Sequence, residues 1–160
     1  MPTNGTTTAT MKGNRSRERP AYRLLDAFVG KWINEGHTIP QDGEDSAKIL
    51  TSDIYEWAVG GFFLVHTTYG RMGDRDGGGM EIITYDADNR VYRSHFFGSD
   101  GDISTHQLTV RDGVWTWAGE TKRCTATFTA DGKTQEAQHE SSLDGHNWKP
   151  SMTVTLTKIV

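Results

Sequence analysis

The segment 28-FVGKWINEGH-37 is the most informative part of the sequence about the fold. It places Gly30 and Trp32 between a short amphipathic segment and a long run of strand-like sequence. Glycine lets a chain turn sharply because it has no Cβ to clash with neighbouring backbone. A tryptophan directly after such a turn is well placed to close one end of a core, and the segments on either side show what that core contains.

The segment before Gly30 predicts a short helix. Pro20 suits the first helical position, and residues 21–29 carry Leu24, Leu25 and Phe28 at spacings of three to four. Gly30 stands where a glycine commonly ends a helix. A helix of about two and a half turns is not stable alone, so we expect its apolar face to lie against a larger core.

From Lys31 onward the sequence is typical of an all-β protein. Runs of β-branched and aromatic residues alternate with turn signals, including four Asp-Gly pairs, a strong hairpin signal. These pairs lie at 100–101, 112–113, 131–132 and 144–145. About ten strands are expected, at 31–40, 47–58, 62–71, 79–86, 90–98, 103–111, 114–119, 123–130, 134–142 and 148–159. The glycine-rich segment 73–79 is interpreted as a flexible hairpin loop between two of them.

Because no helix-length segment separates these strands, consecutive antiparallel hairpins are the simplest connection. An open sheet of this size would expose two long edges, and closing it into a barrel removes them. The predicted fold is all-β, an antiparallel up-and-down barrel of about ten strands with the short N-terminal helix closing one end. A two-layer sandwich is the alternative architecture.

Alternation of apolar and polar residues assigns the inner face of three strands. The residues predicted to point inward are His106, Leu108 and Val110, then Cys124, Ala126 and Phe128, then Met152, Val154 and Leu156. The segment 53-DIYEW-57 is expected to bury Asp53, Tyr55 and Trp57. Strands 62–71 and 90–98 are apolar on both sides, so the faces of His66 and His95 stay open.

Length and composition limit the remaining classes. A chain of 160 residues corresponds to one domain, and we expect a disordered tail at 1–19 and the barrel at 20–160. A net charge of −4 argues against a nucleic-acid-binding surface. The longest run of large apolar residues, Phe62 to Val65, is far too short to span a membrane. One cysteine and no apparent signal peptide favour a cytoplasmic protein.

The sequence also resembles known barrels. Gly30-x-Trp32 with a basic residue, Lys158, near the end of the last strand resembles the calycin superfamily, in which the basic residue packs across the tryptophan ring. A closer resemblance is to the bacterial DUF1579 family. It rests on 30-GKW-32, 57-WAVGGFFL-64, 83-ITYD-86, 144-DGHNW-148 and 155-TLTK-158. This resemblance implies a lipocalin-like barrel and transfers no catalytic motif.

A barrel of about ten strands is wider than one filled by its own side chains, so we expect a ligand cavity. The residues expected to bind a ligand are Tyr55, Trp57, His66, His95, Phe97, His106, Phe128 and Met152. The candidates for general acid–base catalysis are His106, His66, His95, Tyr55 and Asp53. No pair of histidines has the spacing of a local zinc motif, so neither a metal nor another cofactor is expected.

Three functions remain open at this stage. The favoured one is binding of a small apolar or amphipathic metabolite, with no nucleic acid or membrane partner and with a homodimer left open. The alternative is a cofactor-free enzyme of the isomerase or cyclase type. A haem protein similar to nitrobindin, which holds haem through a histidine near its C-terminal end, ranks lower because residues 151–160 contain no histidine.

Overall fold

The computed structural model describes residues 19–160, and its helical part is shorter and tighter than the sequence indicates. Helix α2 (Pro20–Leu24) continues into a 3₁₀ turn, η1 (Leu25–Ala27). A 3₁₀ turn repeats every three residues, so Tyr22, Leu25 and Phe28 are buried while Leu24 is 51% exposed. The expectation that Leu24 belongs to the buried face is therefore wrong. The predicted tail at 1–19 falls outside the described residues except for its last residue.

All ten predicted strands are present, and they are connected as consecutive antiparallel hairpins. They are β1 (Gly30–Thr38), β2 (Lys48–Trp57), β3 (Leu64–Met72), β4 (Arg75–Asp86), β5 (Val91–Gly98), β6 (Ile103–Arg111), β7 (Val114–Ala118), β8 (Lys122–Phe128), β9 (Thr134–Ser141) and β10 (Lys149–Lys158).

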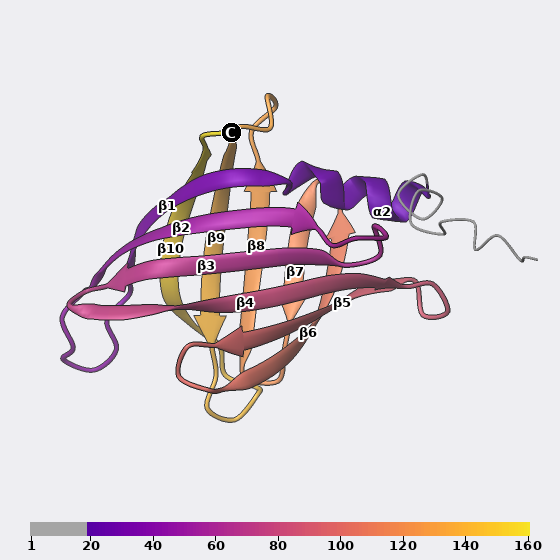
Figure 1. Ribbon diagram of the computed structural model, residues 1–160. Coiled ribbons are helices and arrows are strands. Elements are labelled where there is room, and N and C mark those ends of the chain that lie inside the picture. The colour runs from indigo at the N-terminus through magenta and orange to yellow at the C-terminus, as the bar shows by residue number, and fades with distance from the viewer. Residues whose placement is uncertain (1–18) are drawn as a thin grey trace, which may run out of the picture.

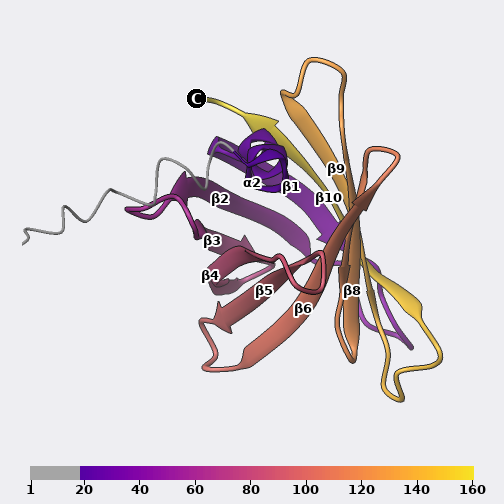
Figure 2. The ribbon, with the colours of Figure 1, turned by 90° about the vertical axis from the view of Figure 1, so that its right-hand side faces the viewer.

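The sheet closes on itself because β1 pairs with both β2 and β10. At the closure Lys31 N–H donates to the Val160 carbonyl at 3.0 Å, and Ile159 N–H donates to the Lys31 carbonyl at 2.8 Å. Figure 1 shows strands β1 to β4 crossing β8 to β10 at a steep angle, and Figure 2 shows the same barrel from the side. The predicted closed barrel is confirmed, and the sandwich alternative is excluded.

The segment 73–79 is less of a loop than the sequence suggests. Strand β3 runs to Met72 and β4 begins at Arg75, so only two residues make the turn. Gly77, Gly78 and Gly79 lie inside β4. Gly78 has φ +138°, and a Cβ there would overlap the Thr68 carbonyl oxygen on β3. Glycine at this position therefore permits close approach of two backbones.

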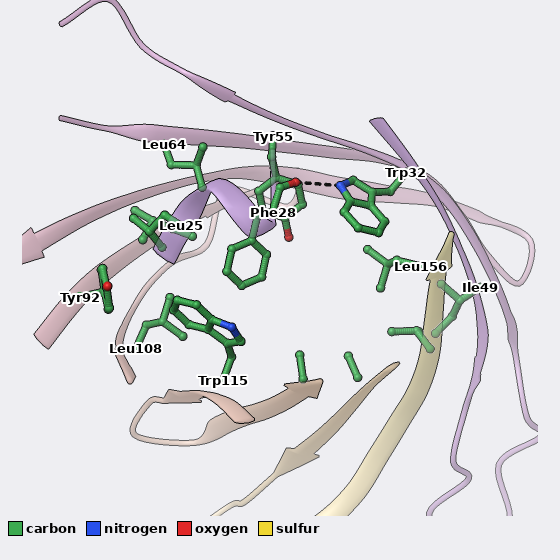
Figure 3. Packing of buried hydrophobic residues seen from close by; sticks show 14 residues of the cluster. Leu25, Phe28, Trp32, Ile49, Tyr55, Leu64, Tyr92, Leu108, Trp115 and Leu156 are labelled. Carbon is green, nitrogen blue, oxygen red and sulfur yellow. Dashed lines mark hydrogen bonds between the residues drawn. The ribbon is translucent and has the colours of Figure 1, made fainter. Parts of the chain in front are cut away.

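One half of the barrel interior is a solid aromatic core, which Figure 3 shows from close by. Phe28 enters from the helical segment, and its ring lies 4.9 Å from that of Trp115 and 5.1 Å from that of Phe128. Trp32 is fully buried beside Phe128 and donates its indole N–H to the Phe28 carbonyl at 2.8 Å. We call this layer the floor; it fills the end of the barrel that the helical segment covers.

The floor has the cation–π contact that the calycin resemblance implied. Trp32 and Lys158 are register partners on β1 and β10. The Lys158 ammonium lies 5.3 Å from the centre of the Trp32 ring, within the range of a cation–π interaction. The opposite end of the barrel, where β1, β3, β5, β7 and β9 end, is called the mouth.

Candidate functional site

A pocket of about 390 Å³ lies inside the barrel between the floor and the mouth. Five of the residues expected from the sequence line it: Asp53, Tyr55, His66, His106 and Met152. The parity predicted for β6, β8 and β10 therefore agrees with the structure. On β3, whose parity the sequence left open, His66 points inward with only 8% of its surface exposed.

The other four expected ligand-binding residues do not line this pocket. His95 is exposed and Phe97 is 38% exposed, because β5 turns Tyr92 and Ser94 inward. Both faces of β5 carry large side chains, so alternation could not decide between them. The expectation that His95 and Phe97 line a cavity is therefore wrong.

Trp57 and Phe128 lie at the covered end of the barrel. The Trp57 indole N–H donates to Asp26 Oδ1 at 2.7 Å, and its ring lies 6.3 Å from that of Tyr22 on the helical segment. Phe128 points inward as predicted, but it packs against Phe28 in the floor. Neither side chain lines the pocket, because Phe128 is part of the floor and Trp57 packs against the helical segment. The expectation that they bind a ligand there is therefore wrong.

A buried charge cluster, defined as Asp53, His66 and Glu81, forms one wall of the pocket. His66 Nε2 lies 2.8 Å from Asp53 Oδ2, and His66 Nδ1 lies 3.0 Å from Glu81 Oε1. The three residues come from β2, β3 and β4 and are 3%, 8% and 6% exposed. Neighbouring strands thus present an acid, a base and an acid side by side inside the barrel.

The second oxygen of each carboxylate is also occupied. Asp53 Oδ1 accepts from Thr51 at 2.6 Å and from Thr68 at 3.2 Å. Glu81 Oε2 accepts from the Ser94 hydroxyl, and from the Trp117 indole N–H at 3.0 Å. Buried charges need such partners, because unpaired ones are strongly destabilising. Both acids of the cluster are accordingly hydrogen-bonded from several strands.

These contacts determine the charge of the cluster. Burial lowers the pKa of His66, but its hydrogen bonds to Asp53 and Glu81 and their negative charges outweigh burial and raise the pKa to about 9. Burial raises the pKa of Glu81, but the bond and charge of His66, with Ser94 and Trp117, lower it overall. At neutral pH an imidazolium between two carboxylates leaves one net negative charge in the wall.

Tyr55 covers this cluster from the side of the floor. Its ring stacks on the His66 imidazole with centroids 3.8 Å apart and an interplanar angle of 8°. Burial and the charges of Glu81 and Asp53 raise the pKa of the Tyr55 phenol well above its usual value. Tyr55 therefore stays a neutral phenol at physiological pH, and it is not a base.

The opposite wall carries His106, Cys124 and His139. Cys124 Sγ lies 3.5 Å from His139 Nε2. Burial lowers the pKa of His139 to about 4 and also lowers that of His106, while burial and the charge of Glu81 raise the pKa of the Cys124 thiol to about 12. At neutral pH this wall therefore presents two neutral imidazoles and a neutral thiol, which can orient a ligand or exchange a proton with it.

Two further residues that line the pocket each contain a buried side-chain atom without a hydrogen-bond partner. The Asn34 side-chain carbonyl oxygen and the Gln135 side-chain amide nitrogen are buried and make no hydrogen bond. Cationic side chains stand nearer the mouth, where Arg71 pairs with Asp76 at 3.2 Å and Arg123 pairs with Glu140 at 2.5 Å. The exposed surface of the pocket is mostly apolar, but polar and charged side chains line it on both walls and near the mouth.

The sequence reasoning missed Glu81, His139, Asn34 and Gln135. The signal for Glu81 was present, because it shares its parity on β4 with Ile83, which is fully buried. His139 likewise shares its parity with Ala137 on β9, which is 6% exposed. A lone polar residue in phase with buried apolar neighbours was the pattern that would have found both.

Within residues 19–160, no three or more His, Cys, Asp or Glu side chains are arranged to hold a metal ion. The same part of the chain contains no helix with the length and hydropathy needed to cross a bilayer.

Comparisons with solved structures reveal the same fold at low sequence identity. Rv2717c from M. tuberculosis is 14% identical, with a TM-score of 0.63 over 89% of this chain and 99% of that one. The S-type phycobiliprotein lyase CPES from Guillardia theta is 9% identical, with a TM-score of 0.50 over 92% of this chain and 97% of that one. At such identities the likeness concerns the fold alone.

Comparisons by sequence identify one family. No curated protein sequence gives a significant match to this chain. The model of the family described as "Protein of unknown function (DUF1579)" matches residues 17–156, which is most of the chain. The resemblance drawn from the motifs is therefore confirmed, and the chain belongs to the DUF1579 family.

Proposed function

We propose that the barrel binds a small amphipathic molecule in its interior pocket. The observation that carries the proposal is the space of about 390 Å³ between the floor and the mouth. Ligand pockets in proteins commonly have volumes of about 300 to 1,000 Å³ and mostly apolar walls with a few placed polar groups. This pocket has that size and a mostly apolar surface, and the polar side chains among its lining give it the amphipathic character that the proposal requires.

The free-energy cost of burying charged side chains in the pocket wall also supports a binding function. Burying two carboxylates and an imidazole costs free energy, and a well-packed apolar core of the same shape is often at least as stable. The floor is such a core, built from the same strands. Polar groups retained in the other half of the barrel therefore favour a role in binding over one in stability.

The first test is to look for a ligand that is already present. Native mass spectrometry of the purified protein should show a bound mass that disappears on denaturation. Titration with an environment-sensitive apolar dye should then show saturable binding, with Trp117 close enough to report it by fluorescence. Fatty acids and haem belong in the same titration, because they represent the two ligand classes that the sequence left open.

A paired substitution locates the binding. Met152 lines the pocket, whereas Thr155, three residues along β10, is exposed on the outer face. Met152→Trp should occupy part of the space and weaken dye binding at least tenfold, while Thr155→Trp should leave it unchanged. Equal binding by the two variants, with both folded, would place the dye outside the barrel and remove this proposal.

General acid–base catalysis is the second candidate, and His106 is the observation that favours it. His66 has both ring nitrogens engaged by carboxylates, whereas His106 lines the pocket and burial lowers its pKa, which keeps it a neutral base. If the barrel catalyses a proton transfer on its ligand, His106→Gln should reduce turnover by roughly 100- to 10,000-fold with nearly unchanged affinity. A change in affinity alone would leave binding as the function.

A further inference from the structure

We propose that the ligand of this pocket carries a single carboxylate, and that Lys122, His106 and His139 bind it near the mouth. The inference rests on the proposed binding function and deepens it by naming the charged group of the ligand. The apolar part of the same ligand then lies deeper in the barrel, between the carboxylate and the floor.

Lys122 is the cation of the pocket lining whose charge has no acidic partner. Arg71 pairs with Asp76, Arg123 pairs with Glu140, and the imidazolium of the buried charge cluster lies between two carboxylates. Within residues 19–160, Lys122 takes part in no ion pair. Its ammonium is therefore available to a negatively charged group at the mouth.

The fold places Lys122 beside two histidines. Lys122 begins β8 with the same parity as Cys124, so it belongs to the inner face at the mouth. The His106 ring packs against Gly119, where an added Cβ would lie 2.9 Å from His106 Nε2 and 2.8 Å from the Lys122 carbonyl oxygen. His139 contacts Cys124, two residues along the chain from Lys122. The three side chains therefore meet in one part of the wall.

Both imidazoles have a nitrogen atom left for a ligand. Neither ring nitrogen of His106 is hydrogen-bonded within the part of the chain that the structure describes, and neither is fully buried. In His139, Nε2 lies 3.5 Å from Cys124 Sγ, while Nδ1 has no such partner and is not fully buried. The neutral thiol can donate to Nε2, which leaves the ring proton on Nδ1. Each imidazole can thus donate one N–H to a carboxylate oxygen.

The charges around the pocket favour one negative charge on the ligand. Lys122 supplies one unpaired positive charge, and hydrogen bonds from the two imidazoles to a carboxylate are charge-assisted and correspondingly strong. A dianion would bring a second negative charge toward the buried charge cluster, whose net charge is also negative. The charge of Glu81 in that cluster already raises the pKa of both histidines. The carboxylate therefore lies on the Lys122 side of the pocket, where an ammonium would be repelled.

Three matched probes test the proposal by isothermal titration calorimetry: 2-naphthoate, 2-naphthamide and 2-naphthylmethylammonium. They share one ring system and differ in the charge of the group under test. We expect 2-naphthoate to bind about tenfold more tightly than 2-naphthamide, as expected for one hydrogen bond to a charged group, and the ammonium probe to bind most weakly. Added salt should reduce the preference, because Lys122 is exposed.

Substitutions connect that preference to the ammonium. Lys122→Met should weaken 2-naphthoate binding about tenfold and leave 2-naphthamide binding nearly unchanged, while Lys122→Arg should keep most of the affinity. Lys133→Met is the matched control. It removes the same charge from an exposed lysine in the turn between β8 and β9, at the covered end of the barrel and outside the pocket lining.

A second pair of variants examines the imidazole contact. His106→Leu removes the N–H and should weaken 2-naphthoate binding, whereas His106→Gln keeps an N–H donor and should retain most of the affinity. His95→Leu, on the exposed outer face of β5, controls for the loss of a histidine elsewhere in the barrel.

The outcomes separate this inference from the binding function itself. Equal affinities for 2-naphthoate and 2-naphthamide, tighter binding of the ammonium probe, or an unchanged 2-naphthoate affinity in Lys122→Met would each overturn the inference. Saturable dye binding that is lost in Met152→Trp would still support the proposed function in all three cases. Absence of binding by every probe and every dye would overturn both.

Discussion

At the scale of single residues, Trp32 combines burial, a hydrogen bond and a cation–π contact. It is fully buried, its N–H reaches the Phe28 carbonyl at 2.8 Å, and the Lys158 ammonium lies 5.3 Å from the centre of its ring. One side chain thus connects the helical segment, the first strand and the last strand. Gly30, two residues earlier, allows the chain to reach that position.

We expect Trp32→Ala to lower the free energy of unfolding by about 3–5 kcal/mol, the usual cost of deleting a buried large aromatic side chain. Trp32→Phe should cost less, because it keeps a ring in the floor and loses the indole hydrogen bond. Urea denaturation of both variants measures the difference. A loss below about 1 kcal/mol for Trp32→Ala would contradict the role assigned to the floor.

Gly30→Ala should be destabilising by about 2 kcal/mol or more, because two separate features oppose a side chain there. Gly30 has φ +137°, and an added Cβ would overlap the Val160 carbonyl oxygen and lie 2.6 Å from Lys158 Cε. Gly77→Ala is the matched control, since a Cβ at Gly77 meets nothing within 4 Å. Its unfolding midpoint should stay within the experimental error of the parent, and similar losses for the two variants would refute the argument.

At the scale of elements, the buried charge cluster connects β2, β3 and β4 inside the barrel. Each strand contributes one titratable side chain, and Ser94 on β5 and Trp117 on β7 hold Glu81 from further strands. The cluster is therefore a cross-strand contact in which the loss of one member leaves the others without their partner.

His66→Gln should cost about 3–5 kcal/mol at pH 7, because it leaves Asp53 and Glu81 as two buried carboxylates without a counter-charge. The loss should become smaller at pH 5, where a carboxylate deprived of its imidazolium can take up a proton. His95→Gln, on the exposed face of β5, should change stability by less than about 0.5 kcal/mol. An equal, small effect of the two substitutions would show that the cluster does not stabilise the barrel.

At the scale of the whole molecule, the buried titratable groups predict how stability depends on pH. The pKa of His66 is raised to about 9 in the folded protein. Its contribution to stability is therefore complete below its ordinary pKa of 6.5 and is lost as the pH rises through 9. The lowered pKa of Glu81 acts in the opposite direction, so its contribution is present above 4.5 and is lost as the pH falls through the folded-state value.

His139 adds a second acidic limb. Burial lowers its pKa to about 4, so its contribution is complete above 6.5 and is lost as the pH falls toward 4. We therefore expect maximal stability near pH 6.5, with losses on both sides, in urea denaturation between pH 4 and 10. His66→Gln should lack most of the alkaline loss, and His139→Leu most of the acidic loss between pH 6.5 and 4. Parallel pH profiles for parent and variants would contradict these assignments.

Features that depend on local sequence pattern were predicted correctly in most cases. Turn signals located the ten strands, alternation assigned the inner faces of β6, β8 and β10, and Gly30-x-Trp32 with Lys158 predicted the floor. These three predictions were correct because each depends only on the periodicity of apolar residues along a strand or on a short sequence motif. Alternation failed for β5, where large side chains occupy both faces, and four-residue helical spacing failed for Leu24, where the chain tightens into a 3₁₀ turn.

Which of the inward-facing side chains contact one another could not be predicted from local pattern, because it depends on the pairing of distant strands. Asp53, His66 and Glu81 are 13 and 15 residues apart in sequence and adjacent only through the register of three strands. Asn34 and Gln135 share a level of the barrel because the first strand closes against the last. Register and closure arise from the summed pairing of all ten strands, and no short segment encodes them. The polar groups of the pocket could therefore be assembled only once the barrel had closed.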